Sequence, residues 1–216
     1  MVRQLDMFET APAPSGPPDF DRRFGTLARE ELGLGAWLDR QPAWVANHQA
    51  LFDELARDLP WRAESRPMYT RVVQVPRLLA RIDGHPLIEE MRVALSEHYG
   101  EDFVRTTAAL YRDGNDSVAF HGDTTARDMV EAIVATVSLG EPRRFMLKPT
   151  EGGEHNKIAM PLGRGDLVVM GGTCQRTWRH GIPKVASAGP RIALMFRPAW
   201  ARNYRTTVAQ GGEKSP

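Results

Sequence analysis

The sequence predicts a mainly β protein with flanking helices, an α+β fold in which an antiparallel jelly roll follows two helices. After Gly100, short runs of β-forming residues alternate with turn signals, at residues 103–111, 133–139, 143–148, 158–161, 167–170 and 192–196. Short strands separated by glycine- and proline-containing turns are typical of sandwiches and barrels. Because no helical pattern between them is long enough for parallel crossovers, we expect the strands to pair antiparallel.

The two ends of the chain have the composition of unfolded segments. The stretch from Glu9 to Asp19 is rich in Ala, Pro, Ser and Gly, and it cannot bury an apolar face. We therefore expect residues 1–19 to form a disordered leader and residues 209–216 a disordered tail. Residues 32–37, Leu-Gly-Leu-Gly-Ala-Trp, are typical of a short strand or turn.

Two amphipathic helices are predicted before Gly100. The first has Asn47 as its N-cap and ends before Pro60. Its apolar stripe consists of Leu51, Phe52, Leu55 and Leu59. The second runs from about Pro86 to residue 99, with Gly100 as its C-terminal stop. We therefore divide the folded chain into residues 20–100, with the helices, and residues 101–208, with the β core.

Composition excludes some classes of protein. Of the 216 residues, 42% are hydrophobic and 25% charged, which is ordinary for a globular protein, and no apolar run approaches the roughly 18 residues of a membrane span. A net charge of +1 gives no bulk attraction for nucleic acid, so such binding would need a local basic face. With one cysteine, Cys174, and no visible secretory signal, we expect a cytoplasmic protein without an internal disulfide.

The segment His121-Gly122-Asp123 predicts a metal site. In an extended chain, side chains two positions apart point to the same face, and Gly122 lets the backbone bend between them. Among the six histidines, only His121 has an acidic residue two positions later. With a distant histidine, this pair would complete a 2-His-1-carboxylate triad, which holds iron(II) and leaves positions open for dioxygen and a co-substrate. The alternative is a solvated loop pair.

Two downstream features could complete such a site. His180 follows the strand predicted at residues 167–170, and its simpler interpretation is a surface histidine at the end of a loop. Arg191 and Arg197 are six residues apart, so both guanidinium groups share one face of a predicted strand. If that face lines the interior, a small dicarboxylate would satisfy both arginines; the alternative is an edge strand with both in solvent.

Taken in order, Tyr-x-x-Gly-x-Asp from Tyr111, His-x-Asp from His121, His180 and Arg-x5-Arg from Arg191 resemble the AlkB family of iron(II)- and 2-oxoglutarate-dependent dioxygenases. The likeness covers about residues 60–198. It implies a double-stranded β-helix catalytic core with an N-terminal nucleotide-recognition lid. It also implies oxidative removal of N-methyl groups from bases of DNA or RNA, of the 1-methyladenine or 3-methylcytosine type, with release of formaldehyde and succinate. A base in a duplex would have to be flipped out of the stack.

The resemblance also implies roles for individual residues. The residues that correspond to the iron ligands are His121, Asp123 and His180. Arg191 and Tyr111 correspond to the residues that bind the remote carboxylate of 2-oxoglutarate. Arg197 corresponds to the arginine near its metal-chelating end. The predicted substrate contacts are Arg66, Met68, Tyr69, Arg71 and Arg127. Basic side chains there could neutralise phosphates while the aromatic or thioether groups stack on an unpaired base. Alternatively, this arginine-rich segment is a solvated helix-to-strand connection, and Arg127 is solvated as well.

Three positions depart from the family pattern. The family often has Asn where this chain has Ala109 and Ala193, so two hydrogen bonds to the co-substrate would be missing. At about 1 kcal/mol each, their loss could weaken 2-oxoglutarate binding tenfold or more unless other groups replace them. Thr125 stands where the family often has an acidic residue for the substrate base, which puts base preference in doubt.

Other functions stay open at this point. A 2-oxoglutarate dioxygenase that hydroxylates or demethylates a protein or a small molecule would keep the metal site but not the basic, aromatic lid. A catalytically inactive binding module and a cupin-type metal protein are further alternatives. We expect a monomer with no membrane partner.

Overall fold

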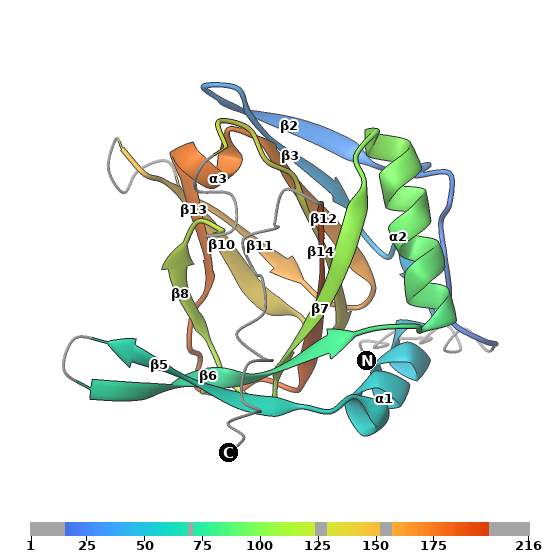
Figure 1. The fold of residues 1–216 in the computed structure, drawn as a ribbon, viewed down its shortest axis with the longest axis vertical. Coiled ribbons are helices and arrows are strands. Elements are labelled where there is room, and N and C mark those ends of the chain that lie inside the picture. Colours follow the sequence, from blue (N-terminus) through green and yellow to red (C-terminus); the bar gives the residue numbers. More distant parts are fainter. Residues whose placement is uncertain (1–15, 69–70, 124–128, 152–156, 199–216) are drawn as a thin grey trace, which may run out of the picture.

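Two antiparallel sheets and two helices form three layers in the computed structural model, which describes residues 16–68, 71–123, 129–151 and 157–198 (Figure 1). The side chains of residues 65–74 lie outside this description. Helices α1 (His48–Asp58) and α2 (Pro86–Tyr99) cover one face of the larger sheet, and the smaller sheet faces its other side. The predicted jelly-roll class is therefore confirmed.

The larger sheet has eight strands in the described part of the chain. Their order is β2 (Ala28–Gly33), β3 (Ala36–Gln41), β12 (Asp166–Gly172), β9 (Val134–Gly140), β14 (Arg191–Pro198), β7 (Phe103–Tyr111), β6 (Arg71–Ile82) and β5 (Arg62–Met68). Strands from before and after Gly100 thus share one sheet.

The smaller sheet contains four described strands. Their order is β11 (Ile158–Leu162), β10 (Arg143–Pro149), β13 (Trp178–Ile182) and β8 (Val118–His121). A short helix, α3 (Cys174–Thr177), leads into β13, and β1 (Asp19–Phe20) pairs with β4 (Val45–Ala46). Because Asp19 belongs to a paired strand, the predicted leader must end earlier; residues 1–15 and the predicted tail lie outside the described residues.

Both predicted helices are present. Helix α1 buries Leu51, Phe52 and Leu55. Asn47 precedes it as predicted, but with a left-handed φ of 50° and no side-chain cap; its amide donates to the Pro17 carbonyl at 3.1 Å instead. This is a correction to the capping role, and its cause is the contact with the preceding segment.

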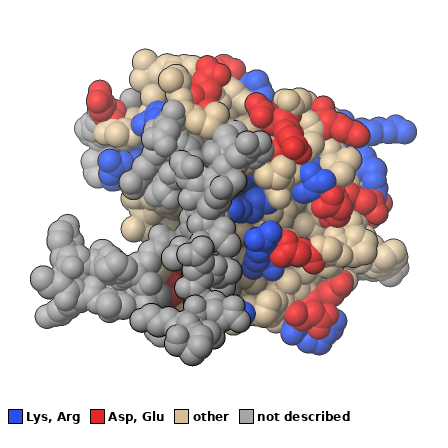
Figure 2. All heavy atoms as spheres, in the orientation of Figure 1, with Lys and Arg blue, Asp and Glu red and all other residues tan. Residues whose placement is uncertain are grey.

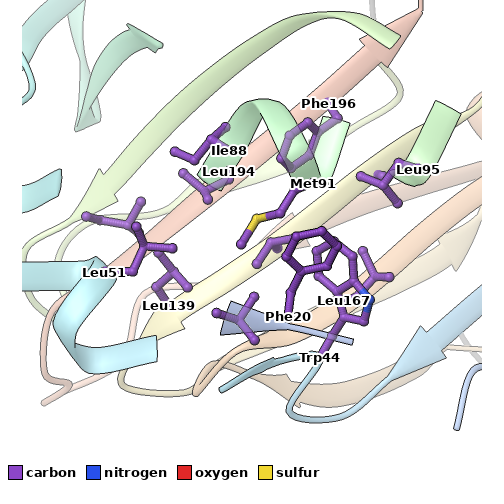
Figure 3. Close-up of a cluster of buried hydrophobic side chains, with 14 of the residues drawn as sticks. Phe20, Trp44, Leu51, Ile88, Met91, Leu95, Leu139, Leu167, Leu194 and Phe196 are labelled. Carbon is purple, nitrogen blue, oxygen red and sulfur yellow. The ribbon is translucent and has the colours of Figure 1, made fainter. Parts of the chain in front are cut away.

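Helix α2 begins with Pro86 and ends at Gly100, which adopts φ 67° as the left-handed terminator. Figure 3 shows Ile88, Met91 and Leu95 of this helix together with Leu194 and Phe196 of β14 in one apolar cluster. Met91 and Leu95 have no exposed surface, and each fully buried side chain of this size contributes about 1.5–3 kcal/mol. This cluster fixes the helices against the larger sheet.

Strand β14 separates this outer core from the interior between the sheets. Ile192, Leu194 and Phe196 face the helices, whereas Ala193 and Met195 belong to the cluster between the two sheets. The alternation predicted for this strand is therefore confirmed. The even-numbered spacing places Arg191 and Arg197 on the same side as Ala193, toward the smaller sheet.

Several strands were not predicted from the sequence. The arginine-rich segment between the helices forms the antiparallel ribbon β5–β6, and β8 and β13 were not predicted as strands. Strands β8 and β13 contain only four and five residues, too few for an alternating apolar pattern to stand out.

Candidate active site

Strands β8 and β13 bring two histidines together. His121 is the Cα partner of His180 in this antiparallel pair, and their ring centroids are 4.3 Å apart. His180 therefore lies within a strand and not at the end of a loop, which corrects the simpler interpretation of this residue. The register becomes irregular directly after His180, as it does at a bulge that re-aims a side chain.

Both rings are held in the neutral form that can bind a metal. Nδ1 of His121 lies 2.8 Å from the Ala119 carbonyl, which can only accept, so Nδ1 carries the proton and Nε2 keeps its lone pair. Burial lowers the pKa of His121, and burial together with the neighbouring imidazole lowers the pKa of His180 to about 3. Neutral imidazoles fixed by a backbone carbonyl are suited to metal ligation.

The backbone at Asp123 is fixed by the short helix α3. The Asp123 amide donates to Oε1 of Gln175 at 2.7 Å, and Gln175 is 5% exposed. A Cβ at Gly122 would lie only 2.6 Å from the Gln175 carbonyl oxygen, so a larger residue would displace α3. Gly122 is required here for this close approach, which agrees with its predicted role as a position without side-chain bulk.

The carboxylate of Asp123 pairs with the second predicted arginine. Arg197 donates from Nε to Oδ2 of Asp123 at 2.6 Å, and from Nη1 to Thr107 at 3.1 Å. In the described part of the chain, no three His, Cys, Asp or Glu side chains converge in metal-binding geometry. The donor types nevertheless fit iron(II): two neutral imidazoles and one carboxylate on adjacent segments are the facial set that this ion prefers.

Arg191 is a buried cation with open hydrogen-bonding capacity. It is 2% exposed, and its Nη2 donates to the Ser138 hydroxyl at 2.6 Å. Its Nε and Nη1 are buried and find no acceptor in the described part of the chain. Burial lowers the pKa of this guanidinium, and the Tyr111 ring lies 5.2 Å from Cζ. A planar carboxylate would satisfy both open donors, so this position fits one end of 2-oxoglutarate.

A second buried arginine, Arg143, lies close to the ring of Tyr111. Arg143 is 2% exposed, with Cζ 5.8 Å from the Tyr111 ring centroid. It donates to the backbone carbonyls of Asp113, Asp116 and Pro183 at 2.8–2.9 Å. The sequence analysis missed Arg143, because its partners come from separate loops. Two buried guanidinium groups around Tyr111 make this part of the interior electropositive, which favours an anionic ligand.

The two alanines that depart from the family pattern lie in one row across three strands. Ala193 on β14 is the Cα partner of Ala109 on β7 and of Ser138 on β9. Residues directly opposite each other on paired strands share a face of the sheet. The Ser138 hydroxyl therefore lies on the same face as Ala109 and Ala193, where the family often has Asn side chains. Ser138, which is fully buried, was not identified from the sequence.

A cavity of about 320 Å³ opens at the metal-ligand segment. Its walls are Phe120, His121, Gly122, Asp123, Thr150, Gln175, Arg176, Trp178 and Arg179. A larger hollow of about 560 Å³ lies beside α2, where Arg22, Arg23, Glu89, Glu90 and Glu97 mix both charges. Figure 2 shows Lys and Arg side chains interspersed with Asp and Glu side chains over the half of the molecule where α2 lies. The smaller cavity is therefore the one relevant to chemistry.

The predicted substrate residues cannot be placed as side chains. Tyr69, Arg127 and Thr125 lie outside the described residues, as do the side chains of Arg66, Met68 and Arg71. The backbone pairing Met68↔Arg71 places these two residues at the far end of the β5–β6 ribbon.

Three comparisons bear on this geometry. Residues 88–197, half of the chain, match the family model of the 2OG-Fe(II) oxygenase superfamily. The alpha-ketoglutarate-dependent dioxygenase alkB homolog 3 of Bos taurus is 30% identical over 175 residues, or 70% of this chain and 61% of that protein. The DNA oxidative demethylase ALKBH2 of Bos taurus is 27% identical over 130 residues, or 57% of this chain and 47% of that protein. The chain thus spans about three-fifths or less of these relatives.

Among solved structures, OsALKBH1 aligns with 79% of this chain and 100% of its own, with a TM-score of 0.54 and 14% identity. This likeness extends to the fold alone. None of the helices in the described residues combines the length and apolar composition that crossing a membrane requires.

Proposed function

The chain belongs to the 2OG-Fe(II) oxygenase superfamily, and on this premise we propose that it oxidatively removes N-methyl groups from bases in DNA or RNA. The expected substrates are bases of the 1-methyladenine or 3-methylcytosine type, with formaldehyde and succinate as products. The observation that carries the proposal is the paired His121 and His180 beside a buried arginine with open donors, in a chain similar to AlkB homologues.

We assign His121, Asp123 and His180 as the ligands of iron(II). Bound there with 2-oxoglutarate, the metal supplies dioxygen activation coupled to oxidative decarboxylation of the co-substrate. The chain's own contribution is orientation: the Ala119 carbonyl fixes the His121 ring, and Gln175 fixes the backbone at Asp123. Arg197 balances the charge of Asp123 and keeps its carboxylate at this end of the site.

The co-substrate is assigned to the interior beside Arg191 and Tyr111. The two open donors of Arg191 would bind the remote carboxylate in a bidentate manner, and the electropositive surroundings would hold it as an anion. Arg197 would lie near the metal-chelating end. The hydroxyl of Ser138 replaces part of the hydrogen bonding that Ala109 and Ala193 cannot provide, because it fixes the orientation of the guanidinium.

The nucleic-acid substrate is supported by the relatives and by the residue types of the β5–β6 ribbon. One relative is named a DNA oxidative demethylase. The ribbon carries Arg66, Met68 and Arg71 around Tyr69, which is the combination of cations and stacking surfaces that binds an unpaired base. We assign Arg127 to the same substrate side.

The test uses the full chain with Fe(II), 2-oxoglutarate and oxygen on single- and double-stranded oligonucleotides with 1-methyladenine or 3-methylcytosine. Formaldehyde and the unmodified base should appear in equal amounts, and Asp123→Ala should abolish both and lower metal content. Turnover of a protein or small molecule, with none of any methylated oligonucleotide, would leave the oxygenase and reject the nucleic-acid substrate.

A further inference from the structure

The cavity beside the metal-ligand segment has basic and aromatic walls. Besides His121 and Asp123, it is lined by Phe120, Arg176 and Arg179, among others. Asp123, which pairs with Arg197, is the only acidic residue that lines the cavity among the described residues. The cavity therefore presents an excess of positive charge next to the proposed reaction site.

Arg176 has hydrogen-bonding capacity left over at this cavity. Its Nε donates to the Met129 carbonyl at 2.6 Å, which fixes the side chain. Its Nη2 is buried and finds no acceptor in the part of the chain that the structure describes. A buried donor without an acceptor is costly, so this position favours a ligand that brings oxygen atoms.

Two further cations, Lys148 and Arg179, lie near Arg176 on the outer face of the smaller sheet. Lys148 on β10 is the Cα partner of Arg179 on β13, so both side chains point to the same face. The Lys148 ammonium lies 4.5 Å from the centroid of the Phe120 ring, which is on β8, on the other side of β13. We call Lys148, Arg176 and Arg179 the basic strip. No member of the basic strip forms an ion pair with a carboxylate within the described ranges.

This contrasts with arginines elsewhere on the surface. Arginines that pair with a nearby carboxylate include Arg22, Arg29, Arg57, Arg81, Arg92 and Arg112. Exposed ion pairs of this kind contribute only about 0–1 kcal/mol each. An unpaired row beside a cavity is the arrangement expected of a surface that meets an external polyanion.

The basic strip and the β5–β6 ribbon lie on two different sides of the proposed reaction site. Strand β8 begins beside β6, where the Ser117 amide donates to the Pro76 carbonyl at 2.8 Å. It ends at His121 beside α3, which carries Arg176 and leads into β13, where Arg179 lies (Figure 1). The ribbon and the basic strip thus lie at opposite ends of β8, roughly 10 Å apart along the strand.

We propose that the basic strip binds the phosphates that flank the target nucleotide on the side away from the β5–β6 ribbon, with the Phe120 ring against a neighbouring unstacked base. This inference rests on the proposed nucleic-acid substrate and adds a second contact surface to it. Lys and Arg contacts to phosphate release counterions, and aromatic rings stack on bases of any sequence. The chain would then hold a strand on both sides of the reacting base and favour an oligonucleotide over a free nucleoside.

The test measures binding of the iron-free chain of 216 residues to a fluorescent single-stranded oligonucleotide with one 1-methyladenine, over a range of salt concentrations. The double variant Lys148→Gln/Arg179→Gln should reduce the slope of log affinity against log salt by about 1.4, or 0.7 for each lost phosphate contact. Phe120→Ala should weaken binding about fivefold or more and leave the slope unchanged. The charge-matched control is Arg23→Gln/Arg57→Gln, which removes two exposed cations away from the cavity and should keep the wild-type slope.

If the slope of log affinity against log salt is equal for Lys148→Gln/Arg179→Gln and for the control variant, the proposed phosphate binding by the basic strip is wrong. If the wild-type chain still repairs methylated oligonucleotide in that case, only this inference fails and the proposed function stands. If the wild-type chain neither binds nor repairs any oligonucleotide, both fail. Arg176→Gln is measured separately with thermal unfolding, because its bond to Met129 also supports the fold.

Discussion

The side chain of Gln175 accepts a hydrogen bond from the backbone amide of Asp123 at 2.7 Å and joins segments 52 residues apart in the sequence. This contact ties α3, directly ahead of the strand that carries His180, to the end of β8, where the other two proposed ligands lie. Among the residues that the structure describes, Nε2 of Gln175 has only the weak acceptor Met170 Sδ, at 3.8 Å. The bond to Asp123 is therefore the interaction that orients this side chain.

We predict that Gln175→Leu lowers metal affinity about 10–100-fold, as is typical when a partner behind a metal ligand is removed. The Asp123 amide would lose its acceptor, and the carboxylate would no longer be held in one place. Calorimetric titration of the metal-free chain with Mn(II) measures the effect without turnover. Gln175→Glu keeps the acceptor and should retain most of the affinity; equal losses in both variants would show that the amide bond is not the cause.

Arg191→Lys should raise the dissociation constant of 2-oxoglutarate at least tenfold. A lysine cannot present two parallel donors to the carboxylate, and it loses the bond from Arg191 Nη2 to Ser138. Titration of 2-oxoglutarate in the presence of Mn(II) gives the constant directly. Arg144→Lys on the exposed side of β10 is the matched control. An equal loss of affinity for oligonucleotide and for 2-oxoglutarate would instead assign Arg191 a structural role.

Asp116 should make stability depend on acid pH. Burial alone would raise the pKa of this carboxyl, but hydrogen bonds from the side chain and amide of Arg112 outweigh it, and the pKa falls below its ordinary 3.8. Because the folded-state pKa is the lower one, the stabilisation is complete above pH 3.8 and is lost as the pH falls through the folded-state value.

Asp116→Asn should therefore cost about 1–2 kcal/mol of unfolding free energy at pH 7, and the difference from wild type should shrink below pH 4. Urea unfolding of both proteins at several pH values measures this difference. Asp113→Asn, at an exposed carboxylate in the same loop, is the matched control for the loss of one carboxylate. A difference that stays constant down to pH 2 would mean that packing, and not charge, explains the loss.

The sequence predicts the parts of this fold that local pattern determines. Strand β7 has the predicted bounds, and β14 alternates between two cores as its residues indicate. The pairing of His121 with His180 could not be predicted, because it depends on the register between two very short strands. Gln175, Ser138 and Arg143 were missed for a related reason: their partners are distant in the sequence, and an isolated polar residue in a strand or short helix has no distinctive pattern.

The last prediction concerns Ser138, which we propose takes part of the role of the missing amides. Its hydroxyl is the acceptor for Arg191 Nη2, and Arg191 already has two buried donors that find no acceptor among the described residues. Ser138→Ala should therefore leave the guanidinium less well oriented. We expect 2-oxoglutarate affinity to fall about fivefold to tenfold, and unfolding free energy by about 1–3 kcal/mol, because another buried donor loses its partner.

Titration with 2-oxoglutarate in the presence of Mn(II), together with urea unfolding, separates these two effects. The second-site variant Ser138→Ala/Ala193→Ser restores a hydroxyl in the same row, because Ala193 is the Cα partner of Ser138 on β14. It should recover part of the affinity, whereas a variant that merely fills space, Ser138→Ala/Ala193→Val, should not. Wild-type affinity in Ser138→Ala would mean that Arg191 is oriented by Tyr111 and the strand backbone, and that the two alanines have no compensating hydroxyl in this chain.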